Sequence, residues 1–135
     1  MKPIHELVPH QGAMCLLDEV LEWNADAIAC RASSHRDPAN PLRGPGGLAA
    51  ITGVEYAAQA AAAHGTLAGN FSGRGYLARL RDVVCGVERL DTEAENLTVR
   101  ATRMAAEGGR LLYDFRIDAG GRELLKGRLS VVLRK

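Results

Sequence analysis

The sequence predicts an α+β domain in which an antiparallel sheet wraps around one central helix. Two strand-like runs come first, a single alanine-rich segment follows, and four longer strand-like runs complete the chain. One helix among six strands is typical of the α+β class, because a helix can cover the apolar face of an antiparallel sheet. The 135 residues have the length of a single domain, 1–135, with enough core to fold without disulfides.

The N-terminal part predicts a short helical turn followed by a hairpin. Residues 4–7 can form one helical turn. Cys15–Trp23 is the first expected strand and Ala27–Ser34 is the second. Asn24 and Asp26 lie between them and favour a tight turn.

The central helix is predicted from about Ala50 to His64, where alanine, the best helix former, is the commonest residue. Gly65 is the expected C-cap. The alanines lie on nearly every face, which is typical of a buried helix. The preceding stretch, His35–Gly47, contains three prolines and three glycines and is predicted to be a loop.

Four strands are expected after the helix, over Tyr76–Leu90, Leu97–Ala106, Arg110–Ile117 and Glu123–Leu133. Glycine pairs at 108–109 and 120–121 are hairpin turn signals between the last three. A lone helix wrapped by a curved sheet leaves one sheet edge open, and such domains commonly pair through that edge. We therefore expect a dimer, either of two identical chains or with a related chain.

Composition excludes several classes of function. The formal net charge of +1 gives no basis for nucleic-acid binding through bulk charge. The N-terminus lacks an apolar signal core, and no run reaches the roughly 18 apolar residues of a membrane span. We expect a cytoplasmic protein without a membrane span, whose three cysteines are reduced thiols. No cluster of His, Cys and carboxylates has metal-ligand spacing, so no metal is expected.

Two motifs resemble the hot-dog-fold 3-hydroxyacyl-acyl-carrier-protein dehydratases. Pro9-His10, an apolar run and Asp18-Glu19-Val20 are similar to their N-terminal signature. Residues 53–60, Gly-Val-Glu-Tyr-Ala-Ala-Gln-Ala, resemble their central-helix motif, in which an acid is followed four residues later by glutamine. Residues 35–42, with Ala-His-Gly at 63–65, resemble the dehydratase-like subfamily of aryl-polyene and polyketide gene clusters.

The resemblance implies the hot-dog fold and a lyase that dehydrates a 3-hydroxyacyl thioester to the trans-2-enoyl product, in fatty-acid or polyene-type biosynthesis. The substrate would be carried on the phosphopantetheine of acyl-carrier protein, and no separate cofactor is expected. The pocket is expected at a dimer interface, at the N-terminal end of the central helix. Two alternatives stay open: a hot-dog acyl thioesterase, and a non-catalytic partner subunit of a dehydratase heterodimer.

One position departs from the family pattern. The family's catalytic histidine belongs to a Gly-His-Phe motif fourteen residues before the helix acid, and Pro41 occupies that place here. His35 is the only histidine shortly before the helix, so we expect it to act as the base instead. A loop or capping histidine is the alternative interpretation.

Glu55 is the expected catalytic acid. It lies near the start of an otherwise apolar helix, and Gln59, four residues later, shares its face and is expected to bind substrate. Burial favours the neutral form of a carboxylic acid, which can protonate a departing hydroxyl. The alternative is a glutamate that only stabilises the helix dipole.

Backbone donors are expected at the helix start. The amides of Ala50 and Ile51 should lack intrahelical acceptors and could bind a thioester oxygen, with Gly46 and Gly47 leaving room for it. An ordinary helix start after a loop is the alternative. Arginines that could line the pocket mouth and receive an acidic carrier protein, or simply be solvated, are Arg36, Arg43, Arg74, Arg79 and Arg81.

Overall fold

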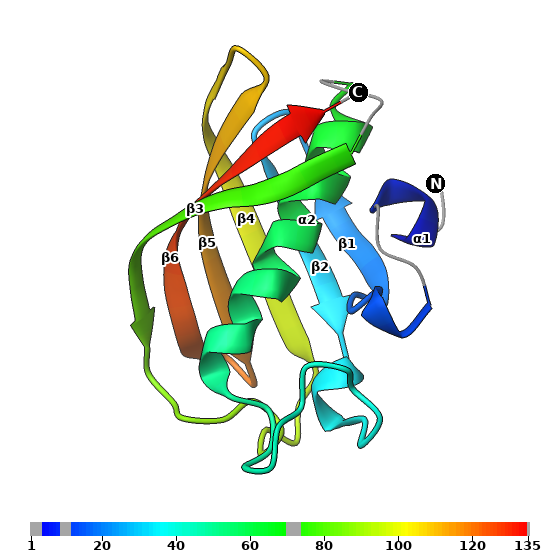
Figure 1. Cartoon of the computed structure of the whole chain (residues 1–135), viewed down its shortest axis with the longest axis vertical. Coiled ribbons are helices and arrows are strands. Elements are labelled where there is room, and N and C mark those ends of the chain that lie inside the picture. Colours follow the sequence, from blue (N-terminus) through cyan, green and yellow to red (C-terminus); the bar gives the residue numbers. More distant parts are fainter. Residues whose placement is uncertain (1–3, 9–11, 70–73, 135) are drawn as a thin grey trace.

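Six antiparallel strands curve around one long helix in the computed structural model, which describes residues 4–8, 12–69 and 74–134. Within these residues the strands are β1 (Glu19–Trp23), β2 (Ala27–Ala32), β3 (Arg74–Cys85), β4 (Leu97–Glu107), β5 (Arg110–Ala119) and β6 (Arg122–Arg134). The sheet order is β1-β2-β4-β5-β6-β3, and helix α2 (Gly53–Leu67) lies on the concave face (Figure 1). The α+β class and the hot-dog fold expected from the sequence are confirmed.

Strand β5 shows why the two faces of the sheet differ. Leu111, Tyr113, Phe115 and Ile117 alternate along it and are buried in the core. The residues between them point to the outer face, because successive side chains of a strand project to opposite sides. The inner face is therefore apolar and packs on α2, whereas the outer face of the sheet carries polar and charged side chains.

Small residues let α2 lie close to the sheet. At Gly53, an added Cβ would lie 2.9 Å from the side chain of Leu125, so the helix could not approach β6 this closely with a larger residue. Its fully buried alanines are Ala57, Ala60, Ala61 and Ala63. This contact fixes the first turn of the helix, which contains Glu55.

The helix ends later than the sequence suggested. It continues to Leu67, and Gly65, the expected C-cap, is buried inside it. The physical reason is that the hydrogen bonds continue past the glycine, since the Ala68 N–H donates to the His64 carbonyl at 2.8 Å. At its other end, a 3-10 turn (Ala50–Thr52) precedes the helix proper.

Two strand ends differ from the prediction because other segments form hydrogen bonds with the backbone groups there. The first strand begins at Glu19 rather than Cys15, because the side chain of Gln59 bonds the backbone of residues 14 and 16. Strand β3 ends at Cys85 rather than Leu90, because residues 88 and 90 pair with residues 48 and 50. The remaining strands and the helical turn α1 (Ile4–Leu7) follow the expected ranges within two residues.

The two edge strands of the described sheet are β1 and β3. Strand β3 is the longer, and its apolar residues Leu80 and Val84 are 38% and 55% exposed. A long edge strand with exposed apolar side chains can pair with a second chain. Within the described residues, no helix is both long and apolar enough to cross a membrane.

Candidate functional site

Glu55 lies in the first turn of α2, and its side chain is half-buried. Its carboxylate has no hydrogen bond or ion pair to any side chain that the structure describes. The helix holds its backbone in place, since Gly53 is packed on the sheet two residues earlier. A rigidly placed carboxylate without an internal partner can exchange a proton with a bound molecule.

Gln59 lies one helical turn further along the same face and is fully buried. Its Oε1 accepts a hydrogen bond from the Leu16 N–H at 2.9 Å, and its Nε2 donates to the Met14 carbonyl at 2.6 Å. The amide is thus occupied by the chain's own backbone. Gln59 holds the segment around residues 14–16 against the helix beside Glu55, and substrate contact through its amide would require these bonds to break.

The helix start offers one free amide instead of two. The Ala50 N–H, expected to bind substrate, donates to the Glu88 carbonyl at 2.9 Å. The Ile51 N–H has no acceptor among the described residues, and its side chain is 51% exposed. Of the two predicted donors, only Ile51 can still bind an incoming carbonyl oxygen.

Gly47 is needed for a different reason from the one expected. Its φ of +99° lies in the region that favours glycine, and an added Cβ would lie 2.6 Å from atoms of Arg89 and Asp91. The space beside this glycine is therefore filled by an ion pair of the same chain. The space expected for a thioester is thus taken on this side of Gly47, whereas nothing lies within 4 Å of a Cβ added at Gly46.

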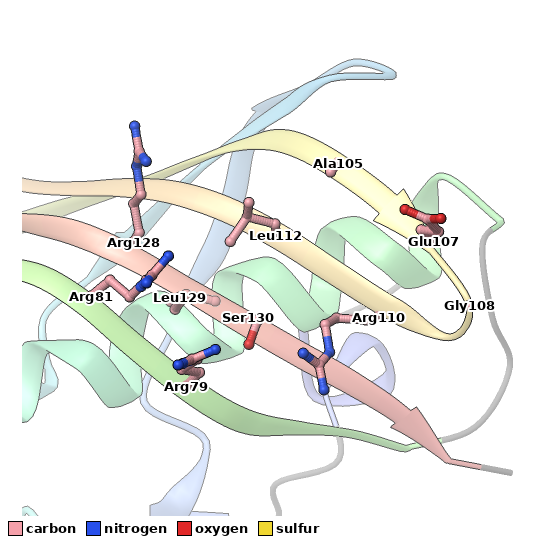
Figure 2. Close-up of a pocket in the computed structure, with 10 residues that line it drawn as sticks. All are labelled: Arg79, Arg81, Ala105, Glu107, Gly108, Arg110, Leu112, Arg128, Leu129 and Ser130. Atoms are coloured by element: carbon pink, nitrogen blue, oxygen red, sulfur yellow. The ribbon is translucent and has the colours of Figure 1, made fainter.

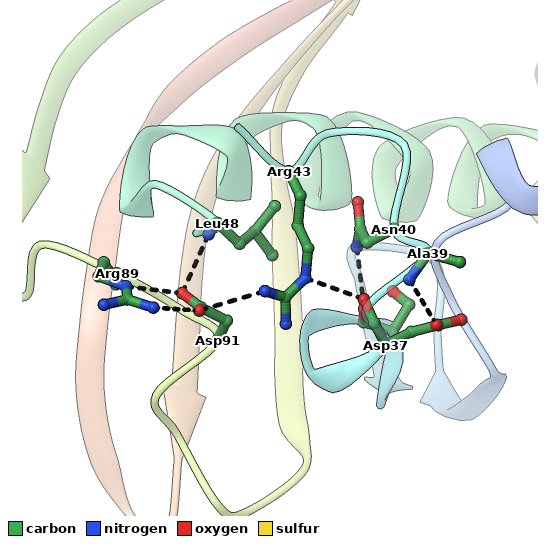
Figure 3. A network of polar contacts seen from close by, with 8 residues as sticks. Asp37, Ala39, Asn40, Arg43, Leu48, Arg89 and Asp91 are labelled. Carbon is green, nitrogen blue, oxygen red and sulfur yellow. Dashed lines mark hydrogen bonds and ion pairs between the residues drawn. The ribbon is translucent and has the colours of Figure 1, made fainter. Parts of the chain in front are cut away.

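Asp91 is the centre of the network that fixes this loop (Figure 3). Its carboxylate accepts hydrogen bonds from the Leu48 N–H at 3.0 Å and from the guanidinium of Arg89, and it pairs with Arg43 at 3.4 Å. The hydrogen bonds from Arg89, together with the Leu48 N–H, hold the pKa of Asp91 well below its usual range. Asp91 thus stabilises the loop immediately before α2.

His35, the expected base, is fully buried in the 3-10 turn Ser34–Arg36. Its Nε2 lies 3.1 Å from the Glu93 carbonyl, which can only accept, so Nε2 carries the proton. Nδ1 is buried without a hydrogen-bond partner in the described structure. Burial lowers the pKa of His35 and favours the neutral ring. The ring has the tautomer of a base, but its free nitrogen is sealed inside the fold and has no hydrogen bond to Glu55.

The other described histidine ring, that of His64, is fully occupied. Its Nδ1 lies 2.7 Å from the Tyr113 hydroxyl, and its Nε2 lies 2.8 Å from the Asn24 carbonyl. His64 therefore has a structural role, joining the last part of α2 to β5 and to the first hairpin. The ring of His5 and the whole of His10 lie outside what the structure describes.

Tyr56, which follows the catalytic candidate, was not identified from the sequence. It is fully buried, and its hydroxyl lies 2.8 Å from the Ser34 Oγ and 3.0 Å from the Asn40 Nδ2. These bonds tie the loop after β2 to the helix next to Glu55. The contacts span 22 and 16 residues, so no local pattern indicates them.

Four of the five arginines that could line a pocket mouth have described side chains, and these four divide between loop contacts and the outer face of the sheet. Arg36 binds the Ala94 carbonyl and Asn96, and Arg43 binds the Asp37 carbonyl and Asp91, so both stabilise loops. Arg79 and Arg81 line a groove on the outer face of the sheet. The side chain of Arg74 lies outside the described part.

The site can therefore supply a proton and one backbone donor. The Glu55 carboxylate could give a proton, the Ile51 N–H could bind an oxygen, and Gln59 holds residues 14–16 against the same helix. Among the described residues no group of three His, Cys, Asp or Glu side chains gathers as a metal site. The two histidine rings that the structure describes, those of His35 and His64, are both buried.

Comparison with known protein families gives one match over nearly the whole chain. A family model described as "ApeP-like: ApeP dehydratase" matches residues 2–135. No curated protein sequence matches the chain.

Solved structures share the fold at low sequence identity. The dehydratase heterocomplex ApeI:P from Xenorhabdus doucetiae matches with a TM-score of 0.87 and 22% identity, covering 100% of this chain and 93% of that one. AziG from S. sahachiroi matches with a TM-score of 0.65, 16% identity, and coverage of 96% and 99%. A hypothetical thioesterase with coenzyme A, from Streptococcus pneumoniae, has a TM-score of 0.61 and 12% identity, covering 86% and 84%.

Proposed function

The chain belongs to the ApeP-like dehydratase family, and we propose that it helps to dehydrate a 3-hydroxyacyl thioester on acyl-carrier protein to the trans-2-enoyl product. The observation that supports this most is the free, half-buried carboxylate of Glu55 on a rigid helix. Dehydration needs an acid for the departing hydroxyl and a donor for the thioester oxygen. In this proposal Glu55 is the acid and the Ile51 N–H is the donor.

In the proposed reaction a base removes the proton from the carbon next to the thioester carbonyl. The Ile51 N–H stabilises the negative charge that develops on the thioester oxygen. Glu55 then protonates the hydroxyl on the neighbouring carbon, the C–O bond breaks, and water leaves as the C=C bond forms. Glu55 must be neutral at the start of this step and recovers its proton from the base or from solvent.

The source of the base distinguishes two forms of the proposal. His35 can act only if the loop around it opens, because its Nδ1 is buried. A related hot-dog chain could instead bring a histidine to Glu55 across the exposed edge of β3. The second form agrees with the heterocomplex found for the ApeI:P dehydratase, and with Pro41 at the place of the family's histidine.

A product assay tests the proposal. The chain, alone and co-purified with a related hot-dog chain from the same source, is incubated with 3-hydroxyacyl-carrier protein, and the thioesters are identified by mass spectrometry. We expect the enoyl product, with a higher rate for the co-purified pair. Release of free acid would instead indicate a thioesterase. If replacement of Glu55 leaves the activity of the co-purified pair unchanged, this chain is a non-catalytic subunit.

A further inference from the structure

The outer face of the sheet carries a groove that the proposed reaction does not use. Its volume is about 460 Å³, and it lies over β3, β5 and β6 and the end of β4. We call it the arginine groove, after four arginines among its lining residues: Arg79, Arg81, Arg110 and Arg128 (Figure 2). Its volume is within the range of small-molecule sites.

Strand registers place the groove opposite the helix. Ser130 of β6 is paired with Leu112 of β5, and both line the groove. Tyr113, the neighbour of Leu112, points to the inner face, where its hydroxyl lies 2.7 Å from His64 of α2. Because neighbouring strand residues point to opposite faces, the groove and α2 lie on different sides of the sheet. The groove is thus separate from Glu55.

Positive charge predominates in the groove, where one carboxylate, that of Glu107, lies among the lining residues beside the four arginines. Arg81 and Arg128 are directly opposite each other on β3 and β6, an arrangement of like charges that destabilises a sheet. Arg128 pairs with Asp114 at 2.9 Å. Arg79, Arg81 and Arg110 have no carboxylate within 4.0 Å among the side chains that the structure describes.

A buried polar group in the groove also lacks a partner. Ser130 is only 5% exposed, and its Oγ has no hydrogen-bond partner among the residues that the structure describes. A buried hydroxyl without a partner is unfavourable, so a water, an ion or a ligand that completes its hydrogen bonding would be stabilised here. The backbone partner of Ser130 on β3 is Arg79, which places this hydroxyl beside the unpaired guanidinium groups.

We propose that the arginine groove binds the phosphate of an organic phosphate, meaning a phosphate ester attached to a slender aliphatic or amide chain. Guanidinium groups bind phosphate oxygens with paired, charge-assisted hydrogen bonds, and Ser130 can donate one more. Leu112 and Ala105 give the attached chain an apolar surface. A second chain paired to the edge of β3 would leave the groove open, because strand pairing lies in the plane of the sheet. The site is independent of the proposed function.

Titration of the ¹⁵N-labelled full chain, in the oligomer in which it purifies, tests this site. The probes are 4′-phosphopantetheine, pantetheine without its phosphate, coenzyme A and inorganic phosphate. We expect amide shifts clustered at Arg79, Arg110 and Ser130, and affinity for phosphopantetheine about tenfold or more above that for pantetheine. Coenzyme A shows whether an attached nucleotide changes binding to the groove, and free phosphate shows whether the phosphate alone is enough for binding.

Matched variants control for net charge. The double variant Arg81→Gln, Arg110→Gln should weaken phosphopantetheine binding about tenfold or more. The control, Arg100→Gln with Arg116→Gln, removes two arginines that contact Asp118 elsewhere and should leave binding unchanged. Circular dichroism confirms that both fold. Equal binding of pantetheine and phosphopantetheine, or an equal loss of binding in the control variant, would overturn the proposal.

Discussion

The side-chain oxygen of Gln59 accepts a hydrogen bond from the backbone N–H of Leu16 at 2.9 Å, across 43 residues of sequence. The same amide donates to the Met14 carbonyl at 2.6 Å, so one side chain replaces two strand-type bonds. The two polar residues of this motif therefore differ in their contacts. Gln59 binds the backbone of residues 14 and 16, whereas the Glu55 carboxylate makes no ion pair with a described side chain.

Replacement of Gln59 should therefore affect stability first. Gln59→Met keeps the size of the side chain but leaves the Leu16 N–H and the Met14 carbonyl without partners. We expect a loss of about 2–4 kcal/mol in the free energy of unfolding, measured by urea denaturation. Glu55→Gln on the same face is the control and should change stability little. A fully stable Gln59→Met variant would show that these two bonds do not hold the segment.

Acid should weaken the loop before α2 through Asp91. The folded-state pKa of Asp91 lies below its ordinary 3.8, so the folded state stabilises the charged carboxylate. This contribution is complete above pH 3.8 and is lost as the pH falls below that value. Asp91→Asn should be less stable than the native chain at neutral pH, and the difference should shrink in acid. Parallel stability curves for the two proteins between neutral pH and acid would contradict this role.

His35 can be tested as a base without removing its anchoring bond. Glutamine can present its Nε2 to the Glu93 carbonyl as histidine does, but it cannot accept a substrate proton. If His35 is the base, His35→Gln lowers turnover by roughly 10²–10⁴-fold with stability nearly unchanged. Native turnover in folded His35→Gln would leave His35 as an anchor for the loop around Glu93 and require a base from another chain.

The exposed edge of β3 predicts association. Static light scattering at micromolar concentration should give about twice the 14.4 kDa monomer mass, or the mass of a pair with a related hot-dog chain. Leu80→Asp on β3 should disrupt this association, whereas Leu21→Asp on the opposite edge strand should not. A native chain that remains a monomer, alone and with related chains, would contradict an interface at β3.

The sequence predicted those features that depend on local patterns. The alanine-rich segment indicated α2, and the glycine pairs at 108–109 and 120–121 indicated the hairpins that join β4, β5 and β6. The features that it missed depend on contacts between distant segments. The Ala50 amide is occupied by Glu88, and Gly47 makes room for Asp91. No pattern within either segment reveals such pairs.

Turnover of the Glu55→Gln variant is the most direct measurement of the proposed chemistry. The variant keeps the shape of the side chain and removes its acidic proton. With 3-hydroxyacyl-carrier protein and the partner chain present, we predict that formation of the enoyl product falls by roughly 10²–10⁴-fold while the variant remains folded and associated. A folded, associated Glu55→Gln variant that dehydrates the substrate at the native rate would contradict the assignment of Glu55 as the catalytic acid.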